Sequence, residues 1–114
     1  LSSVTNTRLQ ALEATKMATI KAGPYNTGTR NGGVAYTTGG VTVYNMTVVV
    51  TFPSGRFSSA PIVLANQGAP SNATGHSTVE RILTQSCSAS QCTLIISDGA
   101  SSNNVYVDLL AFQQ

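Results

Sequence analysis

The side chains that acid–base or nucleophilic chemistry would require are few in this chain. It has four carboxylates and one histidine, at Glu13, Glu80, Asp98, Asp108 and His76. Two of these carboxylates lie in a predicted helix and a predicted strand, which leaves Glu80 and Asp98 as the pair that a glycosidase would need. A triad of His76, Ser77 and Asp98 lacks the sequence context of a nucleophile elbow. We therefore predict that the protein is not an enzyme.

The two cysteines, Cys87 and Cys92, flank four small residues in "QSCSASQC". If those residues form a hairpin turn, the two Cβ atoms come within disulfide range. The alternative is a pair of free, partly buried thiols. One histidine and two cysteines at this spacing do not complete a zinc site, so we predict no metal and no cofactor.

Polar loop residues gather at one end of the molecule if successive strands alternate in direction. The segments 66–76 and 98–104 then lie together, and 53–60 and 87–91 lie at the other end. Short amides, a carboxylate and an imidazole suit sugar hydroxyls, which need paired donors and acceptors. The alternative is that these residues only form turns. With the strand residue Arg81 added, the predicted ligand-binding residues are Asn66, His76, Arg81, Asp98, Asn103 and Asn104.

Arg81 shares a predicted strand face with Val79 and Leu83. Its planar guanidinium can form bidentate bonds to a sugar, or to a carboxylate such as Glu80 of a neighbouring subunit. The alternative is an exposed, solvated arginine.

The elements that would position these residues begin with a helix over residues 1–16. Leu1, Val4, Leu9 and Leu12 fall within one wedge of a helical wheel. A helix this short is marginal alone in water, so its stripe must pack on its own domain or on copies of itself. We expect the end of a coiled-coil stalk in a chain cut from something longer.

The rest of the chain alternates apolar runs with turn residues. Residues 17–40 are predicted to be a linker with first short strands at 17–22 and 34–36. In "VTVYNMTVVVTF" every second residue from Tyr44 to Phe52 is apolar, which predicts a strand with one buried face. Four more apolar runs follow, and Phe57 is expected to fill the core. Five to seven strands separated by Gly, Ser and Asn predict an all-β antiparallel sandwich or barrel over 41–114.

Composition narrows the partners. Charged residues make up 9% of the chain, and its six Lys and Arg residues are scattered singly, with a net charge of +2. No basic stripe is present to follow phosphates, so we predict no nucleic-acid binding. No apolar run is long enough for a membrane-spanning helix, so we expect no membrane insertion.

The stretch "VTFPSGRFSSAPIVLANQ", followed by "STVERILTQ", "CTLIISDG" and "NNVYVDLLAF", resembles the H-type lectin domain over about residues 48–113. The Phe57-to-Pro61 link in its strand context is the most specific part. The resemblance implies a six-stranded antiparallel β-sandwich that forms trimers and binds galactose-type sugars between subunits. The family's strand arginine matches Arg81. The chain departs from the family in "SDGASS", where the family's sugar-packing aromatic is missing.

Such lectin-like domains also stand at the tips of phage tail fibres, after coiled-coil stalks. The resemblance therefore implies a non-catalytic tip domain of a homotrimeric fibre or adhesive spike, located in the virion, that binds a host cell-surface glycan. Two alternatives remain. One is a purely structural trimerisation or connector domain, and the other is a secreted H-type lectin.

Overall fold

The computed structural model describes residues 6–8, 16–68, 79–99 and 104–113. These residues form an all-β body with one short 3₁₀ helix, Thr27–Thr29, after the first strand. The strands are β1 (Met17–Asn26), β2 (Val34–Thr38), β3 (Val41–Thr51), β4 (Ile62–Gly68), β5 (Arg81–Cys87), β6 (Gln91–Asp98) and β7 (Asn104–Phe112). The all-β prediction is confirmed. The described residues contain seven strands rather than the six implied by the resemblance.

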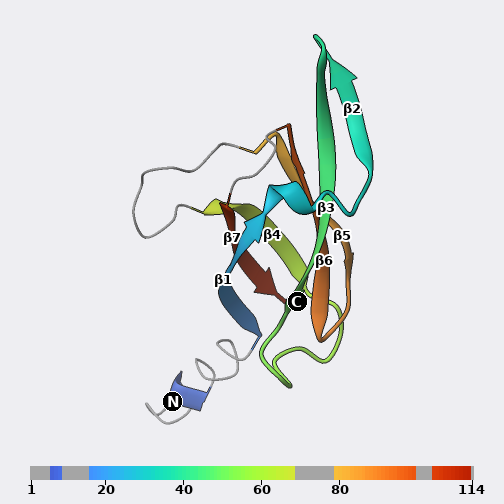
Figure 1. Cartoon of the computed structure of the whole chain (residues 1–114). Coiled ribbons are helices and arrows are strands. Elements are labelled where there is room, and N and C mark those ends of the chain that lie inside the picture. The colour runs from blue at the N-terminus through green and yellow to red at the C-terminus, as the bar shows by residue number, and fades with distance from the viewer. Residues whose placement is uncertain (1–5, 9–15, 69–78, 100–103, 114) are drawn as a thin grey trace.

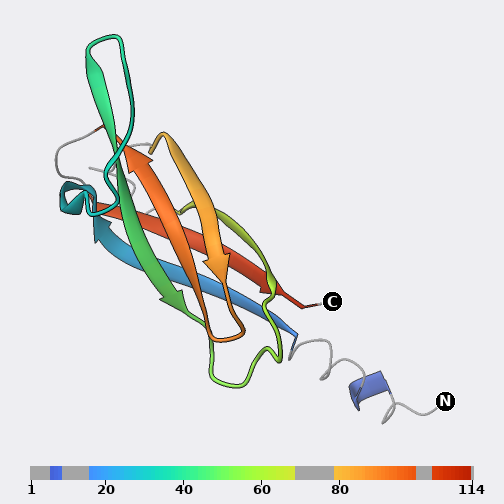
Figure 2. The same cartoon turned by 90° about the vertical axis from the view of Figure 1, so that its right-hand side faces the viewer.

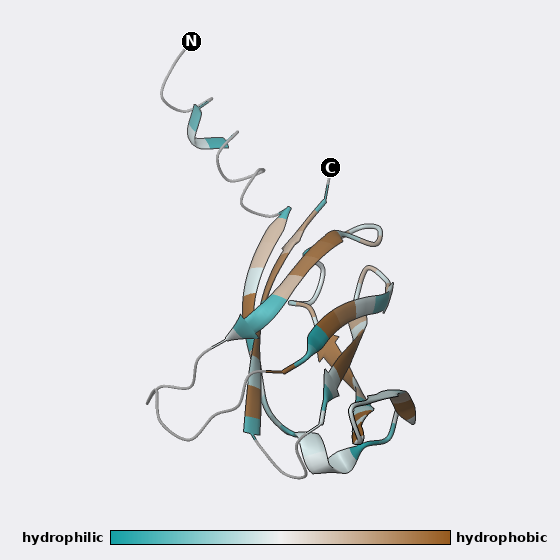
Figure 3. Ribbon diagram, turned by 90° about the horizontal axis from the view of Figure 1, so that it is seen from above, coloured by the Kyte–Doolittle hydropathy of each residue, from teal (hydrophilic) through white to brown (hydrophobic). Residues whose placement is uncertain are grey.

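The strands form two antiparallel sheets, one with the order β1-β7-β4 and the other with the order β2-β3-β6-β5 (Figure 1). Inward residues of both sheets belong to one hydrophobic cluster, in which Leu94 of β6 and Val107 of β7 are fully buried. Hydrophobic residues colour stretches of both sheets in Figure 3. Strands with an apolar side chain at every second residue thus bury one face of each sheet in this cluster.

The predicted alternation of β3 is confirmed from Met46 onward, since Met46, Val48, Val50 and the following Phe52 are buried, whereas Val49 on the other face is 51% exposed. It is wrong at the start of the run, where Tyr44 is only half-buried and Val43 is the buried residue. Phe57 fills the core as expected, because its ring packs edge-on against that of Phe52 with centroids 5.3 Å apart. The segment between β3 and β4 therefore contributes to the core and does more than connect two strands.

β1 is longer than the sequence indicates, because it runs from Met17 through Gly23-Pro24 to Asn26. A bulge between Ala22 and Tyr25 absorbs the Gly-Pro pair, and the pairing with β7 then resumes. Gly23 has φ +108°, and a Cβ there would lie 2.7 Å from Val105 O. The glycine that looked like punctuation thus allows close approach to β7. Part of the expected linker 17–40 is a strand of the three-stranded sheet.

Most of the predicted N-terminal helix lies outside the described residues. Residues 6–8 are helical and Lys16 is in a turn. The expected coiled-coil stalk therefore stays a prediction.

The body has two distinct ends. One end carries the Cys87–Cys92 disulfide, and we call it the disulfide end. There Phe52 N donates to Ser90 O, and Met17, Ile62 and Phe112 lie in one register row. At the opposite end β3 continues past β6 and forms a hairpin arm with β2, residues 34–43, which projects from the body (Figures 1 and 2). We call this the arm end. β4 also ends there, and β5 and β7 begin there.

Candidate functional site

Arg81 opens β5 at the arm end and lies opposite Ser97 of β6, which in turn lies opposite Asn45 of β3. The Arg81 Nε donates to Ser97 Oγ at 3.2 Å, and Ser97 Oγ donates to Asn45 Oδ1 at 2.6 Å. Ser97 is 0% exposed, while the Arg81 side chain is exposed. One row of hydrogen bonds across three strands therefore orients the guanidinium.

This row leaves the guanidinium ready for a ligand. In the described part of the chain, the Ser97 bond is the only polar side-chain contact of Arg81. A bond through Nε sets the plane of the group, and the two terminal amino groups keep the fork geometry that matches paired oxygen acceptors. A carboxylate or two neighbouring sugar hydroxyls would suit it.

A groove of about 340 Å³ lies between β4 and β5, beside Arg81. A hydrogen bond joins two of its lining residues, because Gln67 Oε1 accepts from Val79 N at 2.9 Å. The groove is lined by Ala65, Asn66, Gln67, Val79, Glu80, Arg81 and Ile82. Asn66 of β4 and Arg81 of β5, two of the predicted ligand-binding residues, are 15 residues apart in the chain and line the same groove.

Of the other predicted residues, Asp98 and Asn104 are described by the structure and do not line this groove. Asp98 ends β6, is buried, and lies opposite Tyr44. Because neighbouring strand residues point to opposite faces, its side chain lies on the other face from Ser97 and Arg81. Asn104 begins β7 and pairs with Asn26 of β1. His76 and Asn103 lie outside the described residues.

A second polar group lies on the outer face of the three-stranded sheet. Lys21 of β1 and Asp108 of β7 form an ion pair at 3.2 Å with both side chains about half exposed, and Lys21 also lies over the Tyr106 ring. Asn66 is next to Asp108 in the same row. A shallow groove of about 570 Å³ follows this face, with Leu64 and Leu110 among its lining residues. An exposed pair such as this one contributes little to stability.

Sequence reasoning missed Asn45, Ser97 and Lys21. Period two places Asn45 and Ser97 on outward positions of their strands, which was a usable signal for a polar row. Gln67 belongs to the polar segment 66–76 that the sequence places at this end, but its contact with the distant Val79 backbone comes from the structure alone.

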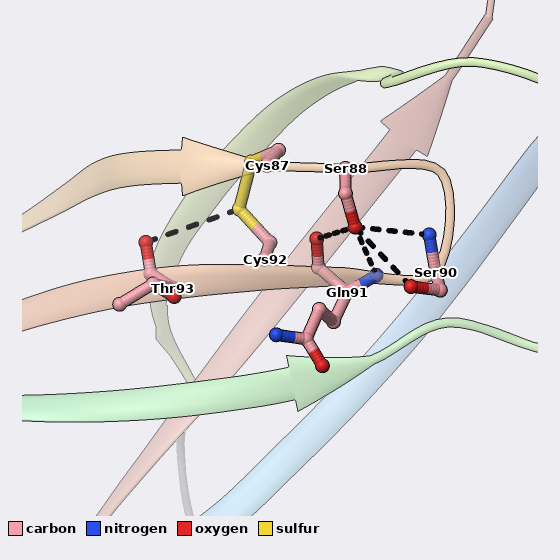
Figure 4. Close-up of a disulfide and its surroundings, with 6 residues drawn as sticks. All are labelled: Cys87, Ser88, Ser90, Gln91, Cys92 and Thr93. Carbon is pink, nitrogen blue, oxygen red and sulfur yellow. Dashed lines mark hydrogen bonds between the residues drawn. A yellow bond between two sulfur atoms is a disulfide. The ribbon is translucent and has the colours of Figure 1, made fainter.

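Cys87 and Cys92 form a disulfide that joins the end of β5 to the start of β6 (Figure 4). Ser88 closes the turn, because its Oγ accepts from Ser90 N and Gln91 N. The disulfide is at the opposite end of β5 from Arg81, so it braces the hairpin and takes no part in the groove.

Electrostatics elsewhere add little to the site. Burial raises the pKa of the Tyr25 phenol above its ordinary value, but Tyr25 is in β1, outside the groove. Among the described residues no cluster of three or more His, Cys, Asp or Glu side chains is arranged to hold a metal ion. No helix within the described ranges has the length and apolar character to span a membrane.

Comparisons with protein-family models, with curated proteins and with solved structures found no match to this chain. The resemblance to H-type lectins therefore rests on the sequence motifs alone.

Proposed function

We propose that this protein is a non-catalytic, trimeric receptor-binding tip domain of a fibre or spike, such as a phage tail fibre, which binds a host cell-surface glycan at the β4–β5 groove. The observation that supports this proposal best is the exposed Arg81. The buried Ser97 orients its guanidinium, and Asn66 lines the same groove. Charged residues make up only 9% of the chain, so few other charged side chains compete with Arg81 for a polar ligand. A polar fork next to amide groups is a chemistry that suits sugar hydroxyls and sugar carboxylates.

The position of the groove in the body agrees with the role of a tip domain. The chain enters the body at Met17, at the disulfide end, and the groove lies toward the arm end. A stalk that precedes Met17 would thus carry the groove away from itself, toward a target surface. Three weak sites on one stalk gain avidity through effective concentration.

A glycan array with host polysaccharides tests the proposal, using the whole chain, Arg81→Gln and Arg56→Gln. Arg56→Gln makes the same change at the disulfide end, where Arg56 donates to Met17 O. We expect wild type and Arg56→Gln to bind, and Arg81→Gln to bind at least roughly ten-fold more weakly, because a charge-assisted hydrogen bond contributes about 1.5–3 kcal/mol. Absence of binding to any host polysaccharide would remove the sugar ligand. Equal binding by both variants would move the site away from the groove.

A structural role as a trimerisation or connector domain is the second candidate. It is favoured by the exposed apolar side chains of the hairpin arm. Under that role the Arg81→Gln protein would support host adsorption as well as wild type does.

A secreted H-type lectin is the third candidate, and the Cys87–Cys92 disulfide favours it because disulfides persist in oxidising compartments. Mass spectrometry of the natural protein, for the disulfide and for attached glycans, separates this candidate from a virion protein.

A further inference from the structure

The arm, residues 34–43, is a hairpin of two strands that pair with no third strand among the described residues. Thr38 pairs with Val41 across Gly39 and Gly40, which both have positive φ, as a tight two-residue hairpin turn requires. The pairing of β3 with β6 begins only at Tyr44. Among the described residues the arm is therefore two strands wide, and a two-stranded hairpin alone is marginal in water.

The two faces of the arm differ. Residues directly opposite each other share a face, so Tyr36 with Val43 and Thr38 with Val41 form one face. Val43 is buried at the root, whereas Tyr36 and Val41 are 39% and 54% exposed. The other face carries Thr37 and Thr42 toward the tip, whose hydroxyls hydrogen-bond at 3.3 Å, and Val34, opposite Tyr44, at the root. Toward the tip, therefore, the two faces differ in polarity. On β3 the face of Tyr36 and Val41 continues into Asn45 and Thr47, on the opposite side of the strand from the core residue Met46. Gly99 lies close to this face, since a Cβ there would be 3.3 Å from Val41 Cγ1. Within the described residues, Tyr36 and Val41 nevertheless stay exposed.

We propose that the apolar face of the arm, Tyr36 and Val41, packs against the same face of the arms of neighbouring copies in the assembled trimer. This inference rests on the trimer of the proposed function. Copies related by rotation about one axis keep the same level along it. An arm at the far end from the chain entry at Met17 therefore reaches only the arm ends of its neighbours.

The charge pattern agrees with a contact between identical arms. No charged residue occurs from residue 31 to residue 55. Identical surfaces that meet around an axis bring like charges together, and this stretch has none to repel. The free edge of β2 also lacks lysine and proline, the usual guards of an exposed edge, so a covering partner would protect it.

The experiment measures the mass of the whole chain during dilution, by light scattering after size exclusion, for wild type and three variants. Val41→Asp changes the apolar face. Thr37→Asp puts the same charge on the other face of the same arm, and Val49→Asp replaces an equally exposed valine of β3 outside the arm. We expect Val41→Asp to raise the dissociation concentration by at least roughly ten-fold, since burial of a valine side chain corresponds to about that factor. The two controls should stay near wild type.

A second variant guards against local unfolding of the arm. The native cysteines are bonded to each other, so only an introduced cysteine reacts with a short bismaleimide. V41C should cross-link neighbouring copies, whereas T37C, on the other face of the arm, should cross-link much more slowly. Unchanged dissociation for Val41→Asp, or equal cross-linking at both positions, overturns the inference while the glycan assay still judges the groove. A monomeric wild type overturns the trimer as well. A trimeric Val41→Asp protein that no longer adsorbs to the host would make the arm a receptor contact and also overturn the inference.

Discussion

Ser97 is a fully buried hydroxyl that both donates and accepts within one row of three strands. Its Oγ uses its hydrogen for Asn45 and a lone pair for Arg81, so a polar atom is buried without a desolvation penalty left unmet. This explains why serine, and not an apolar residue, lies at that position of β6.

Ser97→Ala should therefore cost more than the loss of one hydroxyl. The change leaves Asn45 Oδ1 and Arg81 Nε without their partner, and we expect the unfolding free energy to fall by about 1–3 kcal/mol in a urea titration. Thr93→Ala, on an outward and half-buried position of the same strand, is the control, with a smaller expected loss. A Ser97→Ala protein that keeps both wild-type stability and wild-type glycan affinity would show that the row does not position Arg81.

At the scale of single residues, strand phase explains what the sequence predicted and what it missed. Arg81 and Asn66, both predicted to bind a ligand, line one groove, and their role in binding stays a prediction. Asp98 was grouped with them as a loop residue, but β6 continues to include it and turns its side chain to the other face. Because β6 extends one residue past Ser97, strand alternation directs the Asp98 side chain to the face opposite that of Ser97.

The β5–β6 hairpin is the element that carries Arg81 at one end and the disulfide at the other. Its ladder runs from Arg81 opposite Ser97 to Cys87 opposite Cys92, with a bulge between Thr84 and Ser86. The residues between the cysteines form a tight turn closed by Ser88, so the covalent link and the turn fix the same short loop.

Replacement of both cysteines by alanine should leave the fold intact. Closure of so short a loop contributes about 2 kcal/mol on the chain-entropy account, and the ladder still pairs the two strands. We expect an unchanged far-ultraviolet circular dichroism spectrum and a lower urea midpoint, with glycan binding retained. Addition of reductant to wild type should reproduce the lower midpoint, and an unfolded variant would contradict this account.

The ends of the strands were predicted less well than their existence. The period-two run from Tyr44 to Phe52 identified β3 almost to its ends, since alternation is a local property. β1 was cut short at Ala22 because a Gly-Pro pair usually ends a strand. Only the pairing with β7 on the far side of the bulge extends it to Asn26.

At the scale of the whole molecule, the body is complete from β1 to β7. The chain before Met17 contributes one described backbone contact to it, Gln113 N to Lys16 O at 2.9 Å. We therefore expect the body to fold independently of the proposed association of copies.

Deletion of residues 1–15 tests that separation. The shortened chain should keep the circular dichroism spectrum of the body and its cooperative unfolding, because the hydrophobic cluster lies within the two sheets. Its mass in solution should shift toward monomer at low concentration, since the predicted stalk is gone. Wild-type assembly by the shortened chain would assign association entirely to the body.

The sequence by itself determined the all-β class, the phase of β3, the core role of Phe57 and the choice of Arg81 as a polar strand residue. These follow from local patterns, since alternation, turn residues and charge are visible within a few neighbours. Only the tertiary structure decided that Ser97 joins Arg81 to Asn45, that Asn66 lines the same groove as Arg81, and that the β2–β3 hairpin extends past the pairing of β3 with β6. Asn45 and Ser97 are 52 residues apart, and register between strands that far apart is set by the packing of both sheets, which no local pattern records.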